Sequence, residues 1–68
     1  MVASKLKTAR EAKGLTQKQL AEAVGLSLRT LQHYEQGSKD LNMAAAITVY
    51  RLAGALNVQL EDLLDIDE

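Results

Sequence analysis

Cysteine and proline are absent from this chain of 68 residues, and histidine occurs once, as His33. The lack of cysteine excludes disulfides and thiolate metal sites, and one histidine leaves no plausible zinc cage. No apolar run approaches the ~20 residues that span a bilayer. The first residues also lack the apolar segment of a secretory signal. We therefore expect a cytoplasmic protein with no cofactor, metal or membrane partner. Its fold is expected to be stabilised by helix packing and self-association.

Charges of the two signs are unevenly distributed along the chain. Residues 1–39 carry seven bases and three acids, for a net +4, whereas residues 40–68 carry one base and six acids, for a net −5. Such asymmetry indicates one half that faces a polyanion and another that repels it. Chance in a short sequence is the alternative explanation. The total charge of −1 by itself argues against a general polyanion binder.

The apolar pattern predicts helices and no strands. Helices are expected over about 3–13, 16–24, 28–36, 42–56 and 59–64, ended where a glycine or Asn57 follows an apolar stripe. Thr16 and Gln19 fit a capping box for the second helix, and Asn42 is the expected cap of the fourth. Within the fourth helix, Gly54 predicts a close helix contact. Tyr50 at helical spacing is expected in the core.

The second and third helices are short and are joined only by residues 25–27. A three-residue turn with glycine between two such helices is typical of a helix-turn-helix. On the wheel of the third helix, Leu31, Tyr34 and Glu35 face the core, while Arg29 and His33 face outward. Side chains of this kind suit base edges in DNA. An ordinary solvated helix face is the alternative interpretation.

Several motifs recur together at fixed spacing along residues 6–64. They are Gly14-Leu15-Thr16-Gln17, Leu20-Ala21-x-x-Val24-Gly25, Tyr34-Glu35-x-Gly37 and Asp62-Leu63-Leu64. In this combination the chain resembles the Xre/Cro-like helix-turn-helix regulators, the group that includes the lambdoid phage repressors. The resemblance covers 59 of the 68 residues. It implies an all-α, compact five-helix lambda-repressor-like domain, with residues 1–68 as one DNA-binding domain and the motif at about 16–37.

The resemblance also implies roles for individual residues. Base-reading positions lie at the start and on the outer face of the third helix, at Leu28, Arg29, Gln32 and His33. Phosphate or backbone contacts are implied for Gln17, Ser27, Thr30 and Lys39. Arg10 and Glu35 match a structural pair that ties the first helix to the third.

Two features depart from the family pattern. Leu28 stands where a polar residue is often found, and a contact with a thymine methyl group is the favoured role for it. Residues 40–47 form a longer stretch than in compact phage repressors and place Asp40 where basic residues are usual. We expect this stretch to add about one helical turn and to make few phosphate contacts.

The expected function is sequence-specific binding of double-stranded DNA by a transcription regulator, with repression as the favoured outcome. A homodimer on a near-palindromic operator is expected, because one small domain makes few base contacts. Leu60, Leu64 and Ile66 are the expected interface. The alternative is an antitoxin-like module that masks a protein partner and regulates its own operon. No residues support an enzyme, since His33 has no group to orient it.

Overall fold

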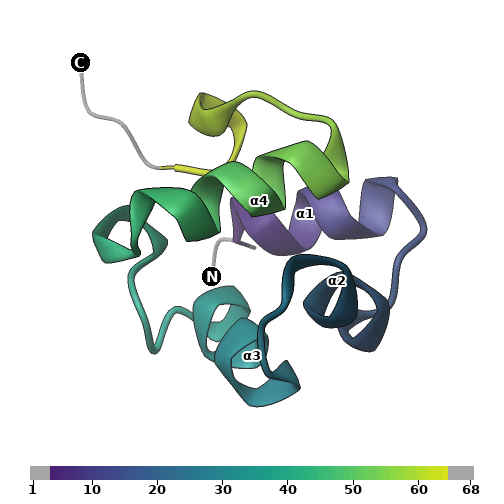
Figure 1. The fold of residues 1–68 in the computed structure, drawn as a ribbon, viewed down its shortest axis with the longest axis horizontal. Helices are drawn as coiled ribbons and strands as arrows, with labels where there is room; N and C mark the ends of the chain where they lie inside the picture. The colour runs from purple at the N-terminus through teal and green to yellow at the C-terminus, as the bar shows by residue number, and fades with distance from the viewer. Residues whose placement is uncertain (1–3, 65–68) are drawn as a thin grey trace.

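The computed structural model describes residues 4–64. Within these residues there is no strand, and helices account for all regular structure (Figure 1). The elements are α1 (Lys5–Ala12), α2 (Gln17–Val24), α3 (Leu28–Gln36), the 3-10 helix η1 (Leu41–Met43), α4 (Ala46–Leu56) and the 3-10 helix η2 (Leu60–Asp62). The all-α expectation is confirmed.

Leucines from each of the four α-helices form the centre of the core. The fully enclosed members are Leu6, Leu20, Leu31, Leu52 and Leu56. α2 packs against both α3 and α4, while η2 closes over α1 and α4. Each fully buried leucine contributes about 1.5–3 kcal/mol relative to leaving it in water, so these few side chains dominate the stability of a small domain.

Local side-chain chemistry sets most helix ends. The hydroxyls of Ser4, Thr16 and Ser27 each accept a backbone N–H three residues on, at 3.0–3.1 Å. The predicted capping box of α2 is confirmed, because the Gln19 side chain accepts the Thr16 N–H in return at 2.9 Å. Asn57 is confirmed as the left-handed residue that ends α4, with φ 55°.

The predicted start of the fourth helix is wrong. Asn42 is not the cap of α4: the Asp40 carboxylate accepts the Asn42 N–H at 2.9 Å and closes the separate turn η1. Ala44 is then extended, and α4 begins at Ala46 without any side-chain cap. The extra turn expected in this stretch is present, but it lies outside the helix because Asp40 bonds the backbone locally.

The five-helix expectation is also corrected, because the described residues contain four α-helices. The segment predicted as a helix over 59–64 contains only the three-residue turn η2. So short a segment cannot offset the cost of starting an α-helix. It is held instead by burial of Leu63 and by the Lys5 ammonium, which donates to the carbonyls of Glu61 and Leu64 at 3.3 and 2.9 Å.

Two predictions about the face of α4 are wrong. Gly54 makes no close helix contact, because a Cβ placed there would meet nothing within 4 Å. Tyr50 is 69% exposed rather than in the core. The buried stripe of α4 runs along Val49, Leu52, Ala53 and Leu56, which leaves Tyr50 and Gly54 on a neighbouring, solvated stripe.

Candidate nucleic-acid interface

The turn between α2 and α3 fixes the angle at which α3 is presented. Gly25 is left-handed, with φ 73°, a conformation that favours glycine because it has no Cβ. The next residue, Leu26, donates its backbone N–H to the Ala21 carbonyl at 2.9 Å and packs its side chain against the core. Ser27 then caps α3. The chain therefore reverses within three residues and holds α3 on the outside of the molecule (Figure 1).

The outward face of α3 carries the side chains expected to read bases. Leu28 is 41% exposed, Arg29 is exposed, and Gln32 and His33 are half-buried. Leu31 and Glu35 on the other side are buried, as the helix wheel predicts. Neither Arg29 nor His33 is enclosed by the protein, so a ligand as large as a DNA groove has access to both.

A buried ion pair ties α3 to α1. Arg10 donates from Nε to Glu35 Oε2 at 2.7 Å and from a terminal nitrogen to Oε1 at 3.1 Å. A third Arg10 nitrogen donates to the Leu15 carbonyl at 2.7 Å. Both side chains are enclosed, at 8% exposure for each residue. The fork ties α1 to α3 and engages all three nitrogens of the guanidinium.

This hydrogen bonding also acts on the titration of the arginine. The hydrogen bond with Glu35 raises the pKa of Arg10, although burial opposes the change. A raised pKa on a base favours the folded state below that pKa, and the stabilisation is lost only as pH rises through it. Because the arginine pKa is already far above neutrality, Arg10 keeps its positive charge in ordinary buffers.

Gln17, at the start of α2, joins this ion pair to the surface of α3. Its Nε2 donates to Glu35 Oε1 at 3.1 Å, and its Oε1 accepts from Gln32 Nε2 at 3.3 Å. Sequence reasoning missed the contact between Gln17 and Gln32. Each residue was assigned a separate role on DNA, and helical periodicity does not show which side chains meet across two helices.

The remaining residues expected at the backbone lie around the ends of α3. The Ser27 hydroxyl donates to the Thr30 hydroxyl at 2.8 Å, so the two are tied together at the first turn. Lys39 is exposed and follows the last turn, where its backbone N–H donates to the His33 carbonyl at 3.2 Å. One base therefore lies near the C-terminal end of α3, and two hydroxyls lie near its start.

The residues expected at a dimer interface are only partly brought together. Leu60 is 44% exposed and Leu64 is half-buried, while Ile66 lies outside the described residues. Three apolar residues that the sequence analysis placed within the fourth helix are also exposed. They are Met43 at 83%, Ile47 at 54% and Tyr50 at 69%. We call Met43, Ile47, Tyr50 and Leu60 the α4 apolar surface.

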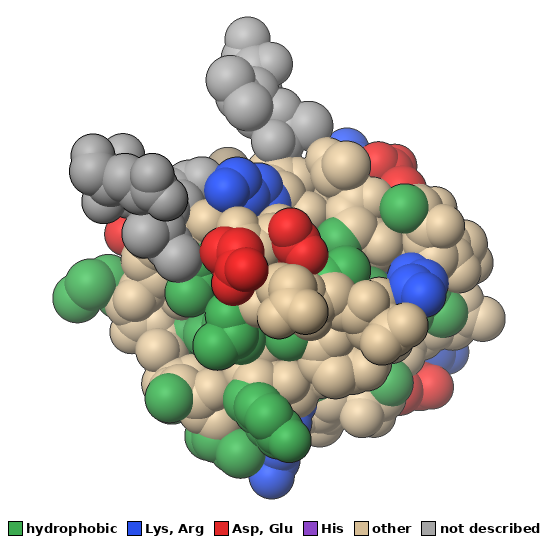
Figure 2. Space-filling view, turned by 90° about the horizontal axis from the view of Figure 1, so that it is seen from above, with side chains coloured by type: hydrophobic (Ala, Val, Ile, Leu, Met, Phe, Trp, Pro, Cys, Tyr) green, Lys and Arg blue, Asp and Glu red, His purple; other side chains and the backbone are tan. Residues whose placement is uncertain are grey.

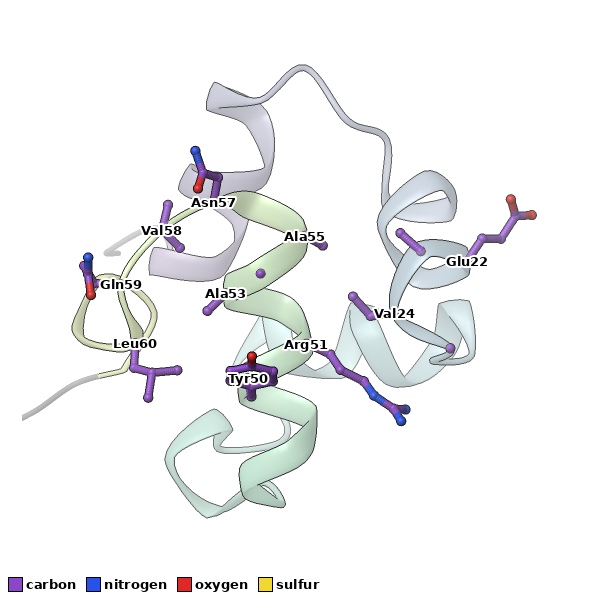
Figure 3. Close-up of a pocket in the computed structure, with 13 residues that line it drawn as sticks. Glu22, Val24, Tyr50, Arg51, Ala53, Ala55, Asn57, Val58, Gln59 and Leu60 are labelled. Carbon is purple, nitrogen blue, oxygen red and sulfur yellow. The ribbon is translucent and has the colours of Figure 1, made fainter.

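This surface lies on the side of the molecule that carries α4 and η2. Figure 2 looks onto that side and shows hydrophobic side chains gathered on one part of it. Tyr50 and Leu60 line one pocket together with Gly54, and both are drawn in Figure 3. No charged residue occurs among residues 41–50, although several of them are exposed.

A helix-turn-helix whose later helix, here α3, is accessible and carries polar side chains is the arrangement that many DNA-binding domains place in the major groove. A family model described as Helix-turn-helix matches residues 6–63. The chain therefore belongs to the helix-turn-helix family of Xre/Cro-like transcription regulators.

Two solved structures have the same fold. One is the restriction-modification controller protein C.AhdI from Aeromonas hydrophila, with a TM-score of 0.77 and 30% identity over 88% of this chain and 86% of that chain. The other is the N-terminal DNA binding domain of SinR from Bacillus subtilis, with a TM-score of 0.79 and 23% identity over 94% of this chain and 90% of that chain. A search among curated proteins gave no match. None of the helices within residues 4–64 is long and apolar enough to cross a membrane.

Proposed function

We propose that this chain is a transcriptional repressor that binds a near-palindromic operator as a homodimer. The observation that carries the proposal is the outward face of α3, which stays accessible while a buried ion pair fixes the helix from behind. An α-helix fits the major groove of B-DNA, where every base pair has a distinct pattern of donors and acceptors. Repression then follows when the bound protein occupies a promoter.

The side chains around the outward face of α3 divide into two roles in this proposal. Leu28, Arg29, Gln32 and His33 face the base edges, with arginine suited to guanine and the leucine to a thymine methyl group. The backbone contacts come from residues at the ends of the helices, which are Gln17, Ser27, Thr30 and Lys39. The free amides at the start of α2 add to the phosphate contact of Gln17.

Replacing Arg29 by alanine tests base reading. The variant is expected to lose about 1–3 kcal/mol of binding free energy on its preferred site and to relax the base preference at one position. Selection of bound sites from random DNA supplies the wild-type site, and fluorescence anisotropy gives the affinities. Arg51→Ala is the matched control, because Arg51 is exposed on α4 and should leave base preference unchanged. If Arg29→Ala binds as the wild type does, α3 does not read DNA in this way.

Self-association is proposed to use the α4 apolar surface. Its four side chains are between 44% and 83% exposed, so the residues that the structure describes leave much of each one uncovered. A second copy would cover them and bring two α3 helices to one DNA molecule. Half-sites would then lie about one turn of DNA apart, roughly 34 Å. One of the two solved structures with this fold, at 30% identity, is a restriction-modification controller protein.

Placing a carboxylate on this surface tests the dimer. Ile47→Asp is expected to be monomeric by analytical ultracentrifugation at concentrations where the wild type is dimeric, because a charge cannot be buried unpaired. Leu28→Asp is the control, since it adds the same charge to an exposed leucine on α3 and should leave association unchanged. A wild type that stays monomeric at high micromolar concentration, with and without operator DNA, would contradict the proposed dimer. The α4 apolar surface would then be a binding site for a different protein.

A further inference from the structure

Gly54 lies within α4 at a position where the fold of the described residues gives no reason for a glycine. Its backbone is helical rather than left-handed, and a Cβ placed there would meet nothing within 4 Å. Glycine destabilises a helix more than any residue except proline, so an alanine would fit here at lower cost. A glycine that the inside of the molecule does not require indicates close approach by something outside it.

The pocket that Tyr50, Gly54 and Leu60 line is an open groove of about 860 Å³ (Figure 3). It is also lined by the end of α2, at residues 22–25, and by the segment after α4, at residues 57–59. Tyr50 is 69% exposed and precedes Gly54 by four residues, so the two lie on one face of the helix. A large exposed ring and an open groove therefore adjoin on the same surface.

This combination of a projecting ring and a groove is self-complementary. In a dimer with two-fold symmetry, both copies use the same surface. When two α4 helices pack antiparallel with the symmetry axis midway between positions 50 and 54, each Tyr50 ring lies over Gly54 of the other copy. The two contacts form together, because the axis exchanges the two positions.

The charges at the groove fit the same arrangement. Arg51 and Glu22 are both exposed and line the groove with opposite signs. Figure 3 shows both on the α2 side, with Arg51 beside Tyr50 and Glu22 farther along α4, toward Ala55. An axis that runs across α4 keeps the two α2 sides together and reverses the direction along the helix. Arg51 of one copy then comes near Glu22 of the other, and the two charges attract.

We propose that the groove at Gly54 receives the Tyr50 ring of a second copy of this chain, in an antiparallel contact between two α4 helices. This inference rests on the proposed function, since it assumes the homodimer, and it adds the contact that aligns the two copies. Tyrosine is enriched among the residues that dominate binding energy, because its rigid ring buries a large area at low entropic cost. Gly54 leaves room for that ring, and Arg51 contacts no base in this arrangement.

Filling the groove with Gly54→Leu tests the proposal. This variant is expected to weaken self-association by about 10- to 30-fold in analytical ultracentrifugation, because the added side chain takes the place of the Tyr50 ring. It should also raise the midpoint of urea denaturation, measured at a concentration where the wild type is monomeric, because leucine favours a helix over glycine. Ala12→Leu is the matched control, since it adds a leucine at an exposed position at the end of α1 and should leave association unchanged.

A size exchange between the two positions tests whether Tyr50 and Gly54 face one another. Tyr50→Ala alone is expected to weaken association by a similar factor, because the ring no longer fills the groove. In the double variant Tyr50→Ala with Gly54→Leu, the added side chain of each copy occupies the space that the ring of the other copy has left. The double variant should therefore associate several-fold more tightly than either single variant, a coupling that distant residues do not show.

Three results would overturn the inference. Unchanged association of Gly54→Leu, alongside a monomeric Ile47→Asp, would place the groove outside the dimer contact and leave the proposed function intact. Losses that simply add in the double variant would show that Tyr50 and Gly54 do not face one another. A wild type that is monomeric with and without operator DNA would remove the homodimer and this inference together, and the groove would then suit a different protein.

Discussion

Glu35→Leu is expected to lower the free energy of unfolding by about 3–5 kcal/mol, because it leaves the Arg10 guanidinium buried and uncompensated. Arg10 is 8% exposed, so water cannot replace the two bonds that the carboxylate accepts at 2.7 and 3.1 Å. The loss is large for a domain of this size, since small proteins have only about 5–15 kcal/mol of stability. Urea denaturation followed by circular dichroism measures it.

The double variant Arg10→Met with Glu35→Leu provides the control for this prediction. Apolar side chains that replace both partners of a buried ion pair are often nearly neutral for stability. The double variant should therefore regain most of the loss of stability. If Glu35→Leu lowers the free energy of unfolding by less than ~1 kcal/mol, the prediction is wrong. The Arg10 guanidinium would then be hydrated in the variant rather than buried without a partner.

Leu31→Ala is expected to cost about 2–5 kcal/mol of stability through loss of buried area and the cavity left behind. Leu31 has no exposed surface and lies on the core side of α3, in the cluster shared with Leu20 and Leu52. Its shortening removes packing from the very helix that is proposed to contact DNA. Binding at a temperature where the variant is folded should be preserved, because no outward side chain of α3 has changed.

Leu28→Ala is the matched comparison, as it changes the same residue type in the same helix. Leu28 is 41% exposed, and exposed substitutions usually alter stability by no more than ~0.5 kcal/mol. The two variants should therefore separate stability from recognition: Leu31→Ala mainly lowers the midpoint of urea denaturation, and Leu28→Ala mainly changes DNA binding. Equal midpoints for the two variants would contradict the placement of Leu31 in the core.

The parts of the fold that follow from local chemistry could be predicted from the sequence. The caps at Thr16 and Ser27 and the left-handed Gly25 depend on residues within three positions of one another, and they fix α2, the turn and α3. The start of α4 could not be predicted in the same way. Asn42 and Asp40 are both good capping residues, and only the closed turn shows that Asp40 takes the local hydrogen bond.

The candidate site could also be predicted only in part from the sequence. Which face of α3 points outward follows from the spacing of Leu31 and Glu35. The bond between Gln17 and Gln32 joins residues 15 positions apart on different helices, so no periodic pattern contains it. Tyr50 was placed in the core because α4 has more apolar residues than one buried stripe needs, and the sequence does not say which stripe is left over.

The Lys5 side chain that closes η2 against α1 also brings the two ends of the described chain together. Its ammonium reaches carbonyls at positions 61 and 64, so Ser4 and Leu64 are separated by little more than one lysine. A short peptide joining them would make a cyclic protein without moving a helix, and new termini could be opened in the exposed loop at residues 37–40. The order in which the helices are connected is therefore separable from the way they pack.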